Sequence, residues 1–164
     1  MGSGRSNLYF NTYGAKSIPG SIDFMDNDDL FSKYIAKRKD IDQNGFFDII
    51  AHGTSENIQI THNGKHINVN HRVIAKLLKT NKKYKKQGIR LLSCSTGQID
   101  NGFAQNLANK LKVPVIAPTD ILWATPSGKY YVASGTYVNG TFIQFGPKKK
   151  KGFKTFYPNK YRRK

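Results

Sequence analysis

The sequence has little that would cross-link a small fold or anchor it in a bilayer. Cys94 is the only cysteine among the 164 residues, so an intramolecular disulfide is excluded. No apolar run approaches the roughly 20 residues that span a bilayer, and the first residues lack the apolar stretch of a secretory signal. A chain of this length forms one domain that can bury a core without a disulfide or a structural metal. Disulfide scaffolds and integral membrane proteins are therefore excluded.

Acidic residues are also scarce. Lysine and arginine number 27 while aspartate and glutamate number 10, which gives a formal net charge of +17. Seven basic residues and no acid lie from Lys76 to Arg90, and nine basic residues and no acid lie from Lys148 to Lys164. Such runs attract polyanions. The charge therefore indicates nucleic acid, an acidic membrane or a polyphosphate as partner, without choosing among them.

The second basic run also contains aromatic residues, and this leaves three interpretations open. Phe153, Phe156, Tyr157 and Tyr161 lie among its charges. The run is typical of a solvated tail, it suits stacking on the bases of single strands, and it equally suits a last strand that holds the tail on the domain.

Hydrophobic patterning predicts an α/β fold. Three short apolar runs are typical of strands buried on both faces, namely Phe46–Ala51, Ile89–Cys94 and Val113–Ala117. A helix capped by Asn70 and a helix over residues 103–111 separate these runs. An earlier helix is expected to begin near residues 26–28 and to end near Lys39. This order implies right-handed crossovers and a central, mainly parallel sheet flanked by helices.

Two Asn-Gly pairs predict tight hairpins. Asn63-Gly64 lies between two short strand patterns, and Asn139-Gly140 lies in the region after Pro118, where short strands follow one another. The C-terminal part is therefore expected to be an antiparallel β-hairpin extension. We divide the chain into an N-terminal arm at 1–20, an α/β domain with a β-flap at 21–145, and a basic tail at 146–164.

Reactive side chains follow two of the predicted sheet strands. His52 and Gly53 follow the first strand, and Cys94 ends the second between Ser93 and Ser95. Ligands of parallel sheets bind beyond the carboxyl ends of the strands, and a Cys–His pair suffices for nucleophilic acyl chemistry. The N–H groups of Gly53 and Cys94 are candidate oxyanion donors, while Ser93 and Ser95 are expected to shape the turn.

The alternative for the same residues is structural. A single cysteine at a strand end often serves as a small buried hydrophobe, and a loop histidine is often simply exposed. His62, His66 and His71 are expected to be surface residues, because their spacing with one cysteine gives no zinc site. The sequence also lacks a glycine-lysine phosphate loop and a G-x-S-x-G elbow.

These segments resemble the caspase-like cysteine peptidases of the caspase–hemoglobinase fold. Within that family they are most similar to the self-processing peptidase domains and C-terminal modules of large bacterial polymorphic toxins. The resemblance covers residues 46–145, and the segments that carry it are FDIIAHG, NGKHINVNHRVIAKLL, IRLLSCSTGQIDNGFAQNLANKL, VPVIAPTDILW, GKYYV and TFIQF.

The resemblance implies roles for individual residues. In that family a histidine is the general base or thiolate partner and a cysteine is the nucleophile, so these roles fall on His52 and Cys94. No third, acidic member is identified, and Asp120 is placed in a specificity pocket. No metal or organic cofactor is implied, but inositol hexakisphosphate activates the self-processing toxin domains at a basic pocket. Residues assigned to that ligand here are Lys129, Lys148, Lys149 and Lys154.

The sequence thus predicts a cysteine endopeptidase module of a secreted or delivered bacterial toxin. It would cleave its own chain or a protein in the target-cell cytoplasm. One alternative is a nucleic-acid-acting toxin domain, either a nuclease or a binder. Others are a thiol deamidase or acyl transferase, and a non-catalytic domain that docks on an acidic immunity protein.

Overall fold

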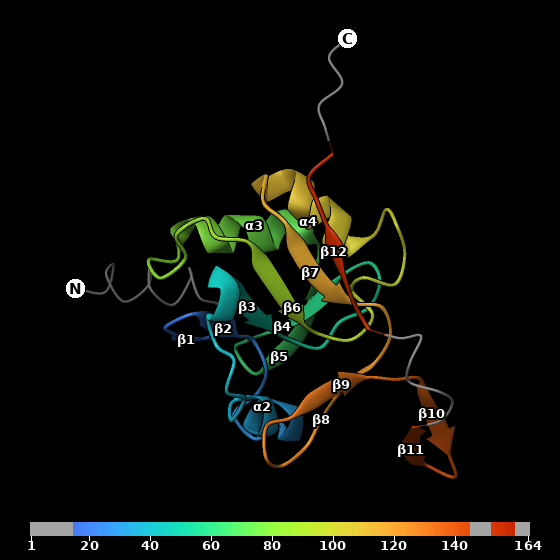
Figure 1. Ribbon diagram of the computed structural model, residues 1–164. Helices are drawn as coiled ribbons and strands as arrows, with labels where there is room; N and C mark the ends of the chain where they lie inside the picture. The colour runs from blue at the N-terminus through green and yellow to red at the C-terminus, as the bar shows by residue number, and fades with distance from the viewer. Residues whose placement is uncertain (1–14, 145–151, 160–164) are drawn as a thin grey trace, which may run out of the picture.

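A six-stranded mixed sheet forms the centre of the protein (Figure 1). The computed structural model describes residues 15–144 and 152–159. The sheet has the order β1-β2-β3-β6-β7-β12, in which the four middle strands run parallel and the two edge strands run antiparallel to their neighbours. The strands are β1 Lys16–Ile18, β2 Ser21–Asp23, β3 Phe47–Ile50, β6 Ile89–Leu92, β7 Val115–Pro118 and β12 Phe153–Phe156.

The α/β class and the mainly parallel sheet are confirmed, and the two edge strands lie in the ranges assigned to the arm and to the tail. β3, β6 and β7 fall on the three predicted apolar runs. β1 lies within the range predicted as an arm, and β12 lies within the range predicted as a basic tail. β12 belongs to the sheet because it pairs with β7 and buries Phe156 in the core. The rest of the predicted arm and tail lies outside the described residues.

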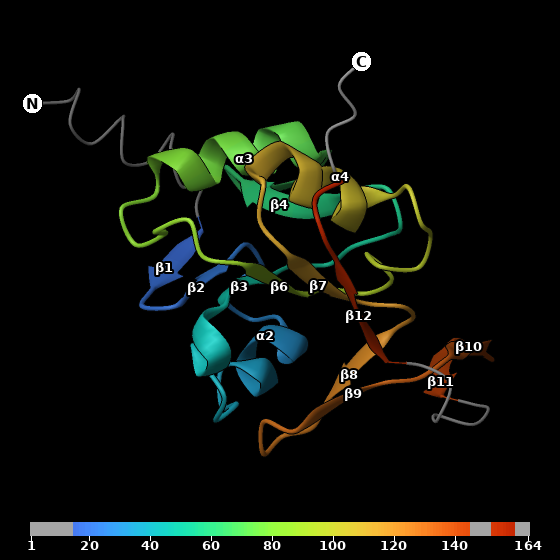
Figure 2. The same ribbon diagram turned by 45° about the horizontal axis from the view of Figure 1, so that its top comes forward.

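Two layers cover the sheet, one on each face (Figure 2). The first layer packs helices α3 and α4 and the β4–β5 hairpin over one core, and the second packs α2 and the β8–β9 hairpin over another. Successive side chains of β3 point to opposite faces of the sheet, so that Ile49 packs in the first core and Ile50 packs in the second. The layer elements are α2 Leu30–Ile35, α3 His71–Thr80, α4 Phe103–Leu111, β4 Ile58–His62, β5 Lys65–Val69, β8 Leu122–Ala124 and β9 Tyr130–Val132.

The helices begin where side chains cap them. The Asn70 side chain accepts the N–H groups of Arg72 and Val73 at the start of α3, as predicted. α2 is shorter than predicted because its chain tightens after Ile35, where the N–H of Arg38 bonds to the Ile35 carbonyl three residues earlier. Among the helices of the described residues, none is long and apolar enough to cross a membrane.

Both Asn-Gly pairs form hairpin turns. Asn63 and Gly64 have φ of 54° and 76°, and Asn139 and Gly140 have φ of 50° and 81°. Two successive left-handed residues are what a type I′ turn requires. The second turn joins β10 (Gly135–Val138) to β11 (Thr141–Gln144), and this hairpin projects from the body of the protein (Figure 1). A 3₁₀ turn, η1, spans Gln43–Gly45.

Asp48 in β3 is a buried carboxylate that holds two arginines. Its Oδ2 accepts hydrogen bonds from Arg38 Nη2 at 2.7 Å and from Arg90 Nη2 at 2.6 Å, and its Oδ1 accepts one from Arg90 Nε at 2.7 Å. The side chains of Asp48 and Arg38 are each only 1% exposed. This network joins the β3–β6 pair to the segment that follows α2.

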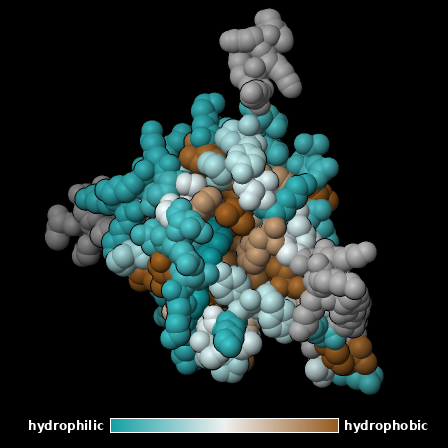
Figure 3. All heavy atoms as spheres, in the orientation of Figure 1, coloured by the Kyte–Doolittle hydropathy of each residue, from teal (hydrophilic) through white to brown (hydrophobic). Residues whose placement is uncertain are grey.

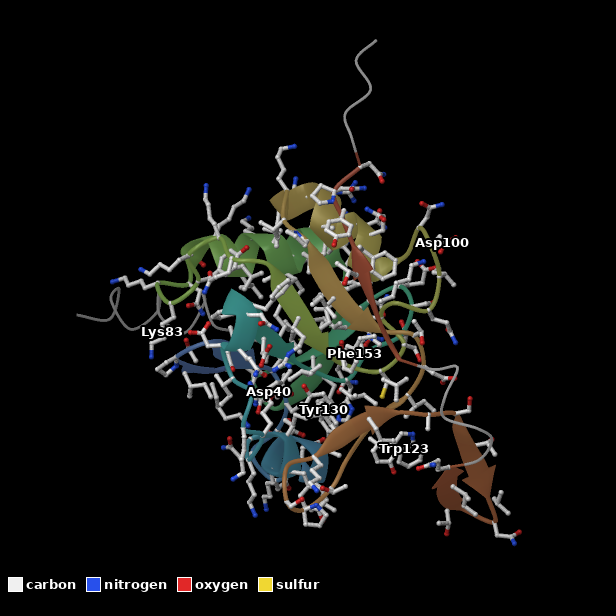
Figure 4. The ribbon with its side chains drawn as sticks, in the orientation of Figure 1. Asp40, Lys83, Asp100, Trp123, Tyr130 and Phe153 are labelled. Atoms are coloured by element: carbon white, nitrogen blue, oxygen red, sulfur yellow. The ribbon has the colours of Figure 1, made fainter. Side chains whose placement is uncertain are left out.

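Arg90 extends this network to Asp40 and Tyr130, which lie side by side (Figure 4). Arg90 Nη1 donates to Asp40 Oδ2 at 2.9 Å and to the Tyr130 hydroxyl at 2.6 Å, and that hydroxyl donates to Asp40. Burial tends to raise the pKa of Asp40, but hydrogen bonds from Arg90 and Tyr130 outweigh it and lower the pKa. β9 is therefore attached to the sheet by partly buried charge as well as by apolar contact.

We expect Asp48→Asn to lower the free energy of unfolding by about 3–5 kcal/mol, because it leaves two guanidinium groups without their shared carboxylate. Urea denaturation measures the change. The matched control is Asp100→Asn, since Asp100 pairs with Lys154 at 3.0 Å but is 87% exposed. Exposed pairs contribute little, so this control should stay within the error of measurement. Equal losses in the two variants would contradict the role given to Asp48.

Candidate active site

The carboxyl ends of β3 and β6 bring His52 and Cys94 to one cavity. The two strands are parallel neighbours with Ile50 opposite Leu92. A step of two residues beyond that pair leads to His52 and Cys94 on the same face of the sheet. Both side chains line a cavity of about 710 Å³. The His52 side chain is half exposed, whereas Cys94 is partly buried.

Gly53 allows the two strand ends to approach each other. A Cβ atom at this position would lie 2.9 Å from Thr96 Cγ2 and 3.2 Å from the carbonyl oxygen of Cys94. A larger residue would therefore push the turn of Cys94 away from the turn of His52. Gly53 also forms a bridge with Ile58, which leads the chain from β3 into the β4–β5 hairpin.

The remaining walls of the cavity are mostly apolar. α2 and β8 supply most of them, and Trp123 of β8 is fixed by a hydrogen bond from its Nε1 to the Ala133 carbonyl at 2.8 Å (Figure 4). The wall residues besides His52 and Cys94 include Met25, Leu30, Phe31, Tyr34, Ile121, Leu122 and Trp123. The cavity can therefore hold an apolar group beside a thiol and an imidazole.

Asp29 is the site residue that the sequence reasoning missed. Its Oδ1 accepts the N–H of Ser32 at 3.1 Å and so caps α2. Its Oδ2 lies 2.6 Å from His52 Nε2. When Nε2 carries the proton of this contact, Nδ1 of His52 is the nitrogen that can accept a proton. One carboxylate thus begins the helix and orients the imidazole.

Cys94 lies in a setting that disfavours its thiolate. Its Sγ accepts the N–H of Leu122 at 3.4 Å and packs against the apolar cluster of the second face. Burial raises the pKa of the Cys94 thiol, and the Asp120 carboxylate adds to the rise, while the Leu122 N–H opposes it. These contacts favour the protonated thiol, so nucleophilic chemistry at Cys94 requires a base.

In the described residues, the two predicted oxyanion donors are not used by the fold. Within residues 15–144 and 152–159, the N–H groups of Gly53 and Cys94 donate no hydrogen bond to the protein. Their neighbours differ, since the N–H of Thr54 bonds to the Asn57 carbonyl and the N–H of Ser95 bonds to the Asp120 carbonyl, each at 2.9 Å. Cys94 lines the cavity, whereas Gly53 is not among its wall residues but follows His52, which is.

Ser93 and Ser95 shape the turn around Cys94. Ser93 is buried and its hydroxyl forms a hydrogen bond with the Thr96 hydroxyl at 3.1 Å. Ser95 has a left-handed φ of 59°. Asp120 is not among the wall residues of the cavity; its carboxylate accepts the Ser134 hydroxyl and its own neighbour's N–H, each at 2.8 Å.

The residues assigned to a polyphosphate are not brought together at this cavity. Lys129 lines a separate cavity of about 990 Å³ together with Lys39. The Lys154 amine lies 3.0 Å from Asp100, and Lys148 and Lys149 lie outside the described residues. In the described part of the chain, no three His, Cys, Asp or Glu side chains gather into a group that could hold a metal ion.

A second His–Asp pair lies on the β4–β5 hairpin. His66, predicted as a surface residue, is half exposed and its Nε2 lies 2.9 Å from Asp26 Oδ2. The contacts of Asp26 with His66 and Thr61 lower the pKa of this carboxyl. Asp26 belongs to the same loop as Asp29, but its hydrogen bonds tie down the hairpin and do not reach His52.

A family model, "Domain of unknown function (DUF8616)", matches residues 20–132. That range runs from β2 to β9 and includes Asp29, His52 and Cys94. No curated protein and no solved structure matches the chain. Because the family match spans most of the sheet and the whole candidate site, the chain belongs to the DUF8616 family.

Proposed function

We propose that the chain is a cysteine peptidase in which Asp29, His52 and Cys94 act together. The observation that carries the proposal is one cavity that holds the thiol of Cys94 and an imidazole already bonded to a carboxylate. Asp29 as the acid, His52 as the base and Cys94 as the nucleophile would have the roles of a catalytic triad. Such a triad is recognised by geometry rather than by sequence position.

The acylation step follows from these contacts. Nδ1 of His52 removes the Cys94 proton as Sγ attacks the carbonyl carbon of the scissile peptide bond. The N–H groups of Gly53 and Cys94 bind the oxyanion of the tetrahedral intermediate. The C–N bond then breaks, His52 returns the proton to the leaving amine, and the acyl group remains on Sγ as a thioester.

Deacylation reverses the roles of the same groups. His52 removes a proton from water, the hydroxide oxygen attacks the thioester carbonyl, and the C–S bond breaks. The proton on His52 returns to Sγ, and the new carboxylic acid leaves the site and loses its own proton to the solvent. Throughout, Asp29 holds the imidazole in one tautomer and offsets the positive charge that His52 carries between the two proton transfers.

The cavity walls support a polypeptide substrate with an apolar side chain beside the scissile bond. Leu30 and Phe31 of α2 and Trp123 of β8 offer apolar surface next to Cys94, and burying such a group gains roughly 25 cal/mol per Å². Asp120 does not supply a charge in that wall. We therefore propose an apolar preference at this position.

We also propose that the domain is caspase-like and acts as a module of a bacterial toxin. This part depends on the resemblance of residues 46–145 and on the chain order of His52 before Cys94. An activating polyphosphate would lie at the 990 Å³ cavity, where Lys39 and Lys129 supply positive charge. Adding inositol hexakisphosphate to the cleavage assay tests this part separately.

We expect Cys94→Ala to abolish cleavage and leave the unfolding temperature nearly unchanged. The assay is mass spectrometry of unfolded casein and of the chain itself after incubation, with Ser95→Ala as a control that keeps the nucleophile. Fragments that persist in Cys94→Ala would refute the proposal. A substrate that gains about one mass unit with its backbone whole would indicate deamidation by the same thiol instead.

Asp29→Asn should lower kcat by on the order of 10²-fold while the helix cap survives, because asparagine caps helices as well as aspartate does. The pH profile should change with it, since the imidazole loses its anionic partner. Asp26→Asn is the matched control, a carboxylate of the same loop that bonds to His66. Equal loss in both variants, or loss in neither, would remove Asp29 from the mechanism.

The free protein should be alkylated at Cys94 by iodoacetamide with an apparent pKa above the about 8.5 of an ordinary thiol. Burial disfavours the thiolate, so the rate stays low at neutral pH and increases as the pH rises through that raised pKa. Because Cys94 is the only cysteine, the intact mass reports this thiol alone. A midpoint near or below pH 7 would mean a preformed thiolate–imidazolium pair and would contradict proton removal during attack.

A further inference from the structure

A cavity lined by lysines lies away from the candidate active site. It has a volume of about 460 Å³, and four of its wall residues are Lys79, Lys86, Lys110 and Lys112. We call it the lysine cavity. The rest of the wall consists of Leu78, Tyr84 and Leu111, so no acidic side chain lines it.

The lysine cavity lies at the amino ends of the parallel strands, whereas Cys94 lies at their carboxyl ends. Lys79 is in the last turn of α3, and Lys110 is in the last turn of α4. Each helix returns the chain from the carboxyl end of one parallel strand to the amino end of the next. Both helices therefore end beside the amino ends of the strands. A partner bound at the lysine cavity would leave the Cys94 cavity open.

Two of these lysines have a backbone conformation that lysine rarely adopts. Lys86 has φ of 67° and Lys112 has φ of 62°. The other positive-φ residues of the described chain that are not glycine are aspartate, asparagine or Ser95. Lys112 is the C-cap of α4, a place where glycine would be less strained. Strained residues of this kind often mark functional positions.

The helix dipole accounts for only part of this arrangement. Lys79 and Lys110 are favourable at helix C-termini for that reason, but Lys86 belongs to no helix. It lies in a loop held by internal hydrogen bonds, in which the Tyr84 hydroxyl donates to the Gln87 carbonyl at 2.9 Å and the N–H of Lys85 donates to Gln87 Oε1 at 2.6 Å. The loop therefore presents its lysines at fixed positions.

Further positive charge surrounds the lysine cavity. Lys82, Lys83 and Lys85 of the same loop are exposed, and Lys83 projects outward (Figure 4). Within the described residues, none of these seven amines forms an ion pair. Hydrophilic residues predominate on the side of the molecule on which α3 and this loop lie (Figure 3). The surface is therefore an unneutralised basic patch.

We propose that the lysine cavity and the 81–88 loop bind the phosphate backbone of double-stranded nucleic acid. A chain of phosphates suits several amines around a cavity and along a loop. Tyr84 is buried, at 9% exposure, so the patch offers it to no unpaired base. The large exposed apolar residues of the described chain lie outside α3, the loop and α4, so nothing here would insert into a membrane.

The test is the binding of a fluorescein-labelled DNA duplex of about 20 base pairs, measured by anisotropy between about 50 and 200 mM salt. Replacing Lys79, Lys86, Lys110 and Lys112 together by glutamine should weaken binding on the order of 10³-fold at 100 mM salt and reduce the salt slope by about 0.9 for each lysine. The matched control replaces Lys33, Lys37, Lys65 and Arg72 by glutamine; these are exposed and line neither basic cavity, so the control removes the same charge elsewhere and should change affinity far less.

Single glycine variants keep the test independent of folding. Lys86→Gly and Lys112→Gly relieve the left-handed strain, so each should keep or raise the unfolding temperature and still weaken duplex binding by roughly eightfold at 100 mM salt. The proposal would be overturned if the control variant bound the duplex as weakly as the quadruple lysine variant, because net charge alone would then explain the loss. Tighter binding of a single strand of the same length would also overturn it.

Two further measurements identify what binds at the lysine cavity and test whether this binding is independent of the proposed peptidase site. Vesicles of phosphatidylcholine and phosphatidylserine should bind equally to wild type and to the quadruple lysine variant. If vesicle binding is lost in that variant while duplex binding persists, the patch is a membrane surface and the proposal fails. Cys94→Ala should bind the duplex as wild type does, because the two sites lie at opposite edges of the sheet.

Discussion

The parallel pairing of β3 with β6 is the constraint on which the candidate site depends. With Ile50 opposite Leu92, the residues two places further on reach the same face at the same height. A slip of one residue in either strand would turn His52 or Cys94 to the other face. The buried carboxylate of Asp48 opposes such a slip, because it bonds to Arg90 on the neighbouring strand only in this register.

The second face of the sheet has an ionic half and an apolar half. Towards the amino ends of the strands, the buried Asp48 and Arg38 form an ionic network with the partly buried Arg90, Asp40 and Tyr130. Towards the carboxyl ends, the same face carries Ile50 and Leu92 and then the mostly apolar cavity. The ionic half fixes β9 and the segment after α2, and these elements in turn position the walls that surround Cys94.

The sequence was sufficient for the centre of the fold and for part of the site. Buried parallel strands are short apolar runs, and Asn-Gly pairs have few other uses, so β3, β6, β7 and both hairpins could be predicted. Asp29 could not, because its contact with His52 spans 23 residues and depends on how α2 lies against the sheet. A favourable interaction with the helix dipole already explains why aspartates precede α2, so the sequence gives no sign of a contact with His52. β12 was one of three open interpretations, and only pairing with β7 distinguishes them.

The net charge of +17 does not make Cys94 acidic, and the reason is distance. Charges separated by more than about 8–10 Å of salt solution are largely screened, and the lysine cavity lies at the far edge of the sheet. The nearby influences on the thiol are burial and Asp120, and both favour its neutral form. A thiol of this kind stays unreactive until a base and a substrate are aligned with it. In the proposed peptidase Asp29 and His52 supply that base, and in the proposed duplex binding the distant lysines act on where the protein binds and not on the thiol.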